Sequence, residues 1–262
     1  MAASLAVLAA PALARGPARI ASERSAATGR PSAWARATAG DSGWMRARLT
    51  EPSPPDGAGA VARYRTDDGA VFILDRSSRQ PLLKFEDSSE VWVLWPERGP
   101  RGDIIYRNDA GQPVLRATRL GGMTVFTDRR PGGAAASFDG GATPLRLTPL
   151  GPVALYQRLF QASVRCTRAA GRLIGFDAPD ASPASDPLIA DAALTAAAAL
   201  ANLSARPGGK ARLASISKVA FLEGARTGVS YKSGVVTITV APSWGVAGRP
   251  SSEKILQALG VR

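Results

Sequence analysis

Short runs of alternating apolar and polar residues, separated by turn residues, dominate the chain between residues 61 and 127. Each turn carries Gly, Asp, Asn or Ser, which tolerate a positive φ or bond to their own backbone. Such runs, at intervals of about ten residues, predict an antiparallel β meander, as a small barrel or a curved sheet. The runs cover residues 61–65, 71–75, 82–86, 90–95, 103–107, 114–118 and 123–127.

A helical spacing of apolar residues replaces this alternation after a Gly-rich connection over residues 131–141. Pro152 suits the first turn of a helix, because its missing N–H would have no partner there. We expect this helix to run to about Ile174 and to end at Gly175. Its apolar stripe comprises Leu155, Tyr156, Leu159, Phe160, Val164 and Ile174, and its arginines gather on the opposite side.

The remaining elements complete a predicted α+β fold. A second, Ala-rich helix begins at Ser185 and Asp186 and runs to about Ser204. Strands follow over residues 214–222, 228–231 and 235–241, with a hairpin turn at residues 232–234. A last helix covers residues 252–259. The fold class is thus an antiparallel β meander followed by two helices, a β-hairpin region and a short C-terminal helix.

The first sixty residues have a different character. Residues 1–14 form an uncharged apolar run in which Ala12 and Ala14 satisfy the small-residue rule of leader peptidase, although the basic region that usually comes first is missing. We interpret this run as a signal peptide, which predicts a periplasmic or secreted protein. Residues 15–60 read as a disordered Arg/Ala/Pro/Gly-rich arm. Residues 61–130 form the meander, and residues 131–262 form a basic α/β part that we expect to pack with it as one unit.

The residue inventory excludes several chemistries. The chain has no histidine and a single cysteine, Cys166. Triads with a histidine base, zinc sites that use imidazole, thiolate cages and intrachain disulfides are therefore ruled out. We expect no cofactor and no metal.

The chain carries a formal net charge of +12, which favours anionic partners. A solvated arginine-rich surface explains the same charge without any partner. A nucleic-acid-binding protein is an alternative function, although we expect nucleic acid less than an envelope protein or an anionic polymer. No stretch after residue 14 approaches the length of about 20 apolar residues that a transmembrane helix needs.

A second alternative is a histidine-free serine hydrolase or acyl-enzyme protein. Ser215 and Lys218 stand in the S-x-x-K spacing of penicillin-binding proteins and serine β-lactamases, and Lys232-Ser233-Gly234 matches their K-[ST]-G box. Those enzymes separate the two boxes much more widely and place the first on a helix, whereas a strand is predicted here. Glu86 and Glu90 offer a carboxylate pair, for which charged residues at the rim of a sheet are the simpler interpretation.

Two tryptophans and four arginines are the candidate ligand-binding residues. Trp92 and Trp95 are three positions apart on one predicted strand, so we expect them to face opposite sides of the sheet, where one could stack on a ligand. The arginines of the first predicted helix could contact anions. They are Arg158, Arg165, Arg168 and Arg172.

Four strings stand out along the chain: FILDRS (residues 72–77), PRGDIIYRNDAG (100–111), LRATRLGG (115–122) and GRPSSEKILQALG (248–260). They resemble those of an exported bacterial family of unknown function. The resemblance implies export but no activity and no site residue. Together these observations predict a non-catalytic binding or structural protein of the bacterial envelope, whose ligand the sequence does not identify.

Overall fold

The computed structural model describes residues 59–261, which fall within one compact unit, Leu49–Arg262. The predicted signal peptide and nearly all of the predicted arm lie outside the described residues. Among residues 59–261, no helix has the length and apolar character needed to cross a bilayer.

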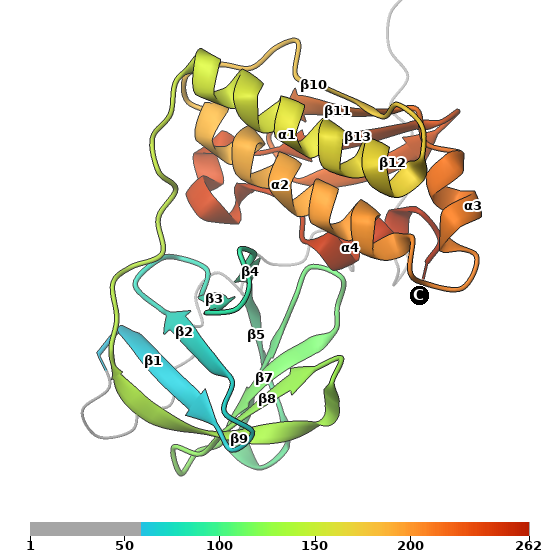
Figure 1. The fold of residues 1–262 in the computed structure, drawn as a ribbon. Coiled ribbons are helices and arrows are strands. Elements are labelled where there is room, and N and C mark those ends of the chain that lie inside the picture. Colours follow the sequence, from blue (N-terminus) through green and yellow to red (C-terminus); the bar gives the residue numbers. More distant parts are fainter. Residues whose placement is uncertain (1–58, 262) are drawn as a thin grey trace, which may run out of the picture. The chain divides into compact units, whose positions relative to one another are not determined.

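The predicted meander is confirmed as a nine-stranded antiparallel sheet that nearly closes into a barrel (Figure 1). Its order is β4-β3-β2-β1-β9-β8-β7-β6-β5. β4 and β5 end this order, yet only Leu94 separates them along the chain, so one bent segment pairs with β3 and then with β6. The strands are β1 (Val61–Thr66), β2 (Val71–Asp75), β3 (Leu82–Phe85), β4 (Val91–Val93), β5 (Trp95–Arg98), β6 (Ile104–Arg107), β7 (Pro113–Ala117), β8 (Met123–Thr127) and β9 (Arg130–Gly141).

Alternation along the strands fills the inside of this barrel with apolar side chains. On β1, for example, Ala62 and Tyr64 are buried while Arg65 is exposed. The same period of two on the other strands places large side chains on one face, where they form a single core. Its largest fully buried members are Tyr64, Phe72, Leu74, Leu83, Leu94, Tyr106 and Leu115.

β9 corrects the prediction of a Gly-rich connection over residues 131–141. This strand pairs with β8 on one side and β1 on the other, so the neighbouring strands supply its backbone hydrogen bonds despite a composition unfavourable to strands. Its small residues permit close packing. At Gly133, where φ is +88°, a Cβ would lie 2.5 Å from Cγ2 of Thr124.

The C-terminal part is a four-stranded sheet with two long helices on one face (Figure 1). Its order is β10-β11-β13-β12; β12 and β13 form the predicted hairpin, whereas β10, β11 and β13 run parallel. An unpredicted short helix, α3, ends at Ala214, the first residue of the predicted 214–222 strand, and the observed strand begins only at Lys218. The elements are α1 (Pro152–Ala170), β10 (Gly175–Asp177), α2 (Asp186–Leu203), α3 (Gly209–Ala214), β11 (Lys218–Glu223), β12 (Gly228–Lys232), β13 (Val235–Val240) and α4 (Ser252–Ala258).

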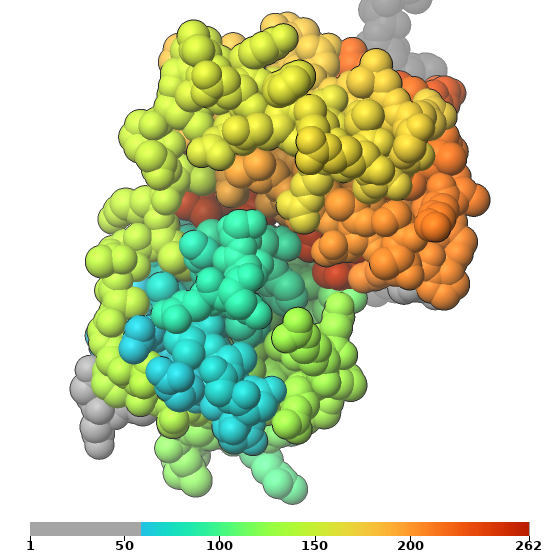
Figure 2. Space-filling view, viewed as in Figure 1, coloured from blue at the N-terminus to red at the C-terminus, as the bar shows by residue number. Residues whose placement is uncertain are grey.

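The first long helix, α1, differs from its prediction in two respects. It ends at Ala170, because Gly171 adopts the left-handed conformation (φ +68°) and closes the helix four residues before the expected stop. Its buried stripe is also narrower than predicted: Tyr156 and Phe160 are exposed by 72% and 62%. The outer surface of α1, yellow-green to yellow in Figure 2, is accordingly uncovered.

The segment before α4 bonds both to the barrel and to the helical layer. The Arg249 side chain, 1% exposed, donates from Nη2 to the Val91 carbonyl oxygen at 2.9 Å and from Nε to the Asp191 carboxylate. Two residues later, the Ser251 backbone N–H donates to Oδ2 of Asp109 at 2.8 Å. These contacts bring the first turn of α4 to the rim of the barrel.

Candidate functional site

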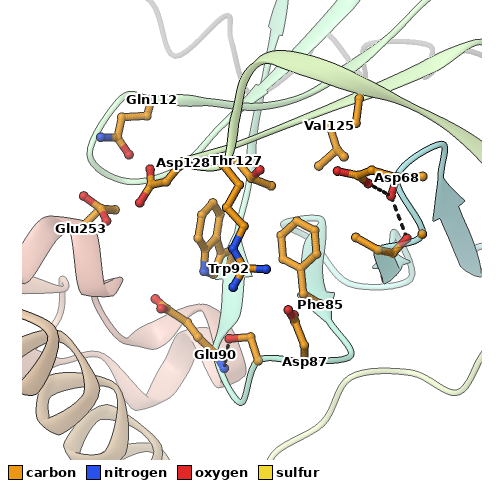
Figure 3. Close-up of a pocket in the computed structure, with 16 residues that line it drawn as sticks. Asp68, Phe85, Asp87, Glu90, Trp92, Gln112, Val125, Thr127, Asp128 and Glu253 are labelled. Carbon is orange, nitrogen blue, oxygen red and sulfur yellow. Dashed lines mark hydrogen bonds between the residues drawn. The ribbon is translucent and has the colours of Figure 1, made fainter.

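A cavity of about 510 Å³ opens at one end of the barrel (Figure 3). Four turns surround it, joining β1 to β2, β3 to β4, β6 to β7 and β8 to β9, and α4 contributes Glu253. In an antiparallel meander every second turn lies at the same end of the sheet, so this topology brings the four turns together. The volume lies within the range of about 300–1,000 Å³ typical of ligand pockets.

Aromatic side chains form the inner wall of this pocket. Phe85 and Trp92, on the paired strands β3 and β4, meet edge to face with ring centroids 6.2 Å apart. Phe72 lies 5.8 Å from Phe85, and Tyr64 stacks on Phe72 at 5.4 Å, so a row of rings leads from the pocket into the core. Packing on this row restrains the Trp92 ring while leaving it half-buried at the pocket wall.

Carboxylates surround the aromatic wall. Figure 3 shows Asp128 and Glu253 on one side of the Trp92 ring and Phe85 on the other, with Glu90 and Asp87 nearby. Asp68 completes the set, and Arg129 is the one cationic residue among those that line the pocket.

The carboxylates differ in their surroundings. Asp68 accepts a hydrogen bond from the Thr66 hydroxyl at 2.5 Å, and this bond lowers the pKa of Asp68. Glu90 accepts a hydrogen bond from the Ser252 backbone N–H at 2.8 Å. Within the part of the chain that the structure describes, the exposed side chains of Asp87 and Asp128 have no hydrogen-bonding or ion-pair partner.

Glu253 lies in surroundings that raise the pKa of its carboxyl. Burial raises the pKa of its carboxyl, and the charges of Asp128 and Glu90 raise it further, while Arg206 opposes the shift. The Arg206 guanidinium is 3.9 Å away, a weak ion pair. The raised pKa therefore comes mainly from desolvation, and a cation beside Glu253 would favour the ionised form of its carboxyl.

Charge is also divided between the two ends of the barrel. The turns at the pocket end contain one cationic residue, Arg129, and seven acidic residues, which are Asp67, Asp68, Glu86, Asp87, Glu90, Asp109 and Asp128. The turns at the opposite end join β2 to β3, β5 to β6 and β7 to β8. They contain one acidic residue, Asp103, and four arginines, which are Arg76, Arg79, Arg101 and Arg119. A strongly basic chain thus presents an acidic pocket.

The two tryptophans fall on opposite sides of the barrel wall. Trp92 packs against the core inside the barrel, whereas Trp95 packs outside it against Leu82, Val93 and Ala247. Only Trp92 lines the pocket. Glu90 was singled out from the sequence only as part of a carboxylate pair with Glu86, and the remaining lining residues were not identified, because each acidic turn by itself is explained by turn chemistry. The signal that could have found them is the alternation of acidic and basic turns along the meander.

None of the four candidate arginines lines this pocket. Arg158, Arg165 and Arg168 are exposed on α1. Arg172 does not belong to the helix, which corrects the prediction: it follows the Gly171 cap and donates a hydrogen bond to the Ala214 carbonyl oxygen.

The residues of the hydrolase alternative bond to other groups. The Ser215 hydroxyl lies 2.7 Å from both the Arg212 carbonyl oxygen and the Tyr231 hydroxyl. The Lys218 ammonium pairs with Asp177 at 2.7 Å.

The two glutamates of that alternative also have separate partners. Glu86 pairs with Arg63 at 3.4 Å, while Glu90 bonds to the first turn of α4. Among the described residues, no three carboxylate or thiol groups are placed to hold a metal ion.

Comparison with known proteins places the chain in a family. No curated protein and no solved structure matches it. Residues 44–259 match the family described as Domain of unknown function (DUF4908), a match that includes the whole barrel and nearly all of the α/β part. The chain therefore belongs to the DUF4908 family.

Proposed function

We propose that this chain is a non-catalytic binding protein of the bacterial envelope, which holds a small organic cation in the pocket at the barrel mouth. The observation that carries the proposal is the pairing of an aromatic wall, Phe85 and Trp92, with a surrounding set of five carboxylates. The proposed ligand is an amine or quaternary ammonium compound with an apolar portion.

The two features favour the same kind of ligand. An ammonium group placed over the face of Trp or Phe is attracted by the ring quadrupole, by about 0.5–2 kcal/mol depending on desolvation. Carboxylates at the rim attract the same charge over a longer range. An apolar portion of the ligand would cover the exposed part of the Trp92 ring.

The local charge sets the pocket apart from the rest of the protein. Five carboxylates and one guanidinium give the lining residues a formal charge of −4, in a chain whose net charge is +12. An anionic ligand would meet repulsion at this rim even though the protein as a whole would attract it. The local charge of the pocket, rather than the net charge of the protein, would therefore select cationic over anionic ligands.

A binding role also agrees with the partners of the candidate catalytic residues. Lys218, the only base that the Ser215 hypothesis offers, is paired with Asp177, and the Ser215 hydroxyl is bonded elsewhere. Location in the envelope is supported by the sequence of residues 1–14, an uncharged apolar run with small residues at Ala12 and Ala14.

Calorimetric titration with three ligands of equal size tests the binding proposal. We expect 2-phenylethylammonium to bind at least tenfold more tightly than 2-phenylethanol, and phenylacetate to bind most weakly. Equal affinity for all three would show that the pocket binds the apolar portion without regard to charge, and it would contradict the proposed ligand class. If none of the three compounds bound, and larger arylammonium ions did not bind either, the proposal that this pocket is a ligand site would be contradicted.

Matched variants locate the effect. Asp128→Asn and Asp87→Asn should each weaken 2-phenylethylammonium binding several-fold while leaving 2-phenylethanol binding unchanged. Asp180→Asn removes the same charge from an exposed position outside the pocket and should change neither affinity. If Asp180→Asn weakened binding as much as Asp128→Asn, overall charge rather than the pocket would be responsible.

Export has a separate test. Mass spectrometry of the protein purified from its native host should show a chain that begins at or near Arg15. A chain that retains Met1 would contradict the envelope location but would not affect the pocket.

A further inference from the structure

The outer face of α1 carries two parallel stripes of exposed side chains. One stripe is apolar: Val153, Tyr156 and Phe160, exposed by 75%, 72% and 62%, recur at the three- and four-residue spacing that aligns side chains along a helix. The other is cationic and comprises the exposed residues Arg158, Arg165 and Arg168. A shallow hollow lies between them, lined by Phe160, Val164, Arg165 and Arg168 among others.

The apolar stripe is not needed to hold the helix in place. α1 packs against α2 and the four-stranded sheet through a separate buried face made of Leu155, Leu159, Ala162 and Cys166. Cys166 is fully buried, and burial raises the pKa of its thiol to about 12. Large apolar side chains that remain in water after a complete inner face has formed indicate a surface that contacts something else.

The charge of α1 has one sign. Between Pro152 and Ala170 the helix contains three arginines and no acidic residue. Just beyond the helix, the surface has a further exposed apolar side chain, Leu173 (74% exposed), and a further exposed arginine, Arg172. This combination, aromatic and aliphatic side chains beside arginines on one helix surface, is typical of helices that lie in the interface of an anionic membrane.

We propose that the outer face of α1 docks on an anionic lipid surface, with Val153, Tyr156 and Phe160 entering the headgroup region and Arg158, Arg165 and Arg168 contacting lipid phosphates. Guanidinium groups form bidentate hydrogen bonds with phosphate. Arg165 and Arg168 border the same hollow as Phe160 and Val164, so a flat surface can contact apolar and cationic side chains at once, while Arg158 lies on the flank of α1 nearest α2. This proposal does not depend on a ligand in the barrel.

Two other occupants fit this face less well. A second copy of the chain would bring arginines against arginines, and like charges at close range oppose association. An acidic protein would satisfy the arginines, but it would have to offer a long apolar groove beside its acidic groups. A lipid surface offers an apolar interior and anionic headgroups side by side, and it needs no groove of matching shape.

Co-sedimentation of the full-length protein with vesicles tests the proposal. One set of vesicles contains equal parts of phosphatidylglycerol and phosphatidylcholine, and the other contains phosphatidylcholine alone. We expect binding to the anionic set only, and weaker binding as salt is added, because salt screens surface charge. Equal binding to both sets, or binding to neither at low salt, would overturn the proposal.

Variants of equal net charge separate this face from the general basicity of the protein. Arg158→Gln/Arg165→Gln/Arg168→Gln should weaken binding to anionic vesicles by about fivefold for each arginine removed. The control, Arg98→Gln/Arg119→Gln/Arg226→Gln, removes the same charge from exposed positions elsewhere. All variants share residues 1–58, so a difference between the two triple variants belongs to the described part of the chain.

The apolar stripe is tested by Tyr156→Gln/Phe160→Gln, which keeps every charge and alters only exposed positions of the helix. We expect at least a tenfold loss of vesicle binding with an unchanged circular dichroism spectrum. If the two triple arginine variants lost vesicle binding equally, the net charge of the protein alone would explain its attraction to the vesicles. Full binding by Tyr156→Gln/Phe160→Gln would show that no apolar contact is made. Either outcome would overturn docking by this face, as would capture of the wild-type face by an acidic protein in preference to anionic vesicles.

Discussion

The Glu90 carboxylate accepts a hydrogen bond from the Ser252 backbone N–H, which lies 162 residues later in the chain and in the first turn of α4. An acceptor with negative charge at this position satisfies a donor that has no partner within the helix, and it interacts favourably with the helix dipole. The bond joins the rim of the pocket to the C-terminal helix, so one residue serves both the site and the fold.

Removal of this acceptor should destabilise the protein. We expect Glu90→Ala to lower the free energy of unfolding by about 1.5–3 kcal/mol, the usual contribution of a hydrogen bond to a charged group. Glu90→Gln keeps a carbonyl acceptor and should retain most of the stability. Urea unfolding followed by circular dichroism measures both, and equal stability of the alanine variant and the wild type would contradict a structural role for the bond.

Arg249 should be among the residues that contribute most to stability. Its buried guanidinium bonds to Val91 on the barrel and to Asp191 on α2, so Arg249→Met leaves a carboxylate and a carbonyl oxygen without their donor. We expect a loss of about 3–5 kcal/mol, as is usual when one member of a buried ion pair is removed. Arg226→Met, at an exposed position, should change stability by less than about 0.5 kcal/mol in the same unfolding assay.

The small side chains of β9 should matter only where the barrel is tight. Gly133→Ala places a Cβ 2.5 Å from Thr124 at a backbone φ of +88°, and the left-handed conformation alone costs about 1–2 kcal/mol for an L-residue. Gly132→Ala, one position earlier, meets open space and has an ordinary φ. Thermal unfolding should therefore separate the two variants by several degrees, and a comparable melting temperature for both would contradict the packing described for β9.

Glu253 gives the protein a pH-dependent stability of predictable sign. Its pKa is raised in the folded state, so the folded protein binds more protons than the unfolded chain between the two pKa values, and this group's contribution to stability falls as pH rises through that interval. Glu253→Gln removes the titration. The ordinary pKa of a glutamate is 4.5. As the pH is raised from below that value, the free energy of unfolding of the variant should increase relative to that of the wild type. The difference should level off once Glu253 is fully ionised in the folded wild type.

Chemical denaturation at a series of pH values measures this difference. Glu97→Gln, which changes an exposed glutamate outside the pocket, is the control for general charge effects. A gain in stability for Glu253→Gln that is larger at low pH than at neutral pH would have the wrong sign and would contradict the raised pKa.

The sequence predicted those parts of the structure that depend on local pattern. The period of two with Gly, Asp and Asn turns identified seven of the nine barrel strands, because alternation and turn chemistry are local properties. The predicted 90–95 strand corresponds to β4 and reaches only the first residue of β5. The last helix, predicted over residues 252–259, is observed as α4 (Ser252–Ala258). The structure adds a cap that was not predicted, in which the Ser251 hydroxyl accepts a hydrogen bond from the Lys254 N–H at 3.1 Å. The hairpin at Ser233 and Gly234, both with positive φ, follows the same rule.

The errors occur where a neighbouring element overrides local preference. Residues 130–141 have the composition of a flexible linker, but they form β9 because β1 and β8 bond to both of their edges. Tyr156 and Phe160 continue an apolar stripe that predicts burial, but the layer beneath α1 is already filled by Leu155, Leu159 and Cys166. In both cases the deciding contact comes from residues far away in the sequence.

The amino-acid sequence alone determined the α+β class, the meander, the two long helices, the absence of imidazole chemistry, and the opposite orientations of Trp92 and Trp95. Tertiary structure alone decided that acidic turns from four separate hairpins meet around Trp92, and that Glu253 joins them from the far end of the chain. Closure of the sheet is the physical reason. The acidic residues of each turn are there for local reasons, and only the return of β9 to β1 sets the turns around a common opening.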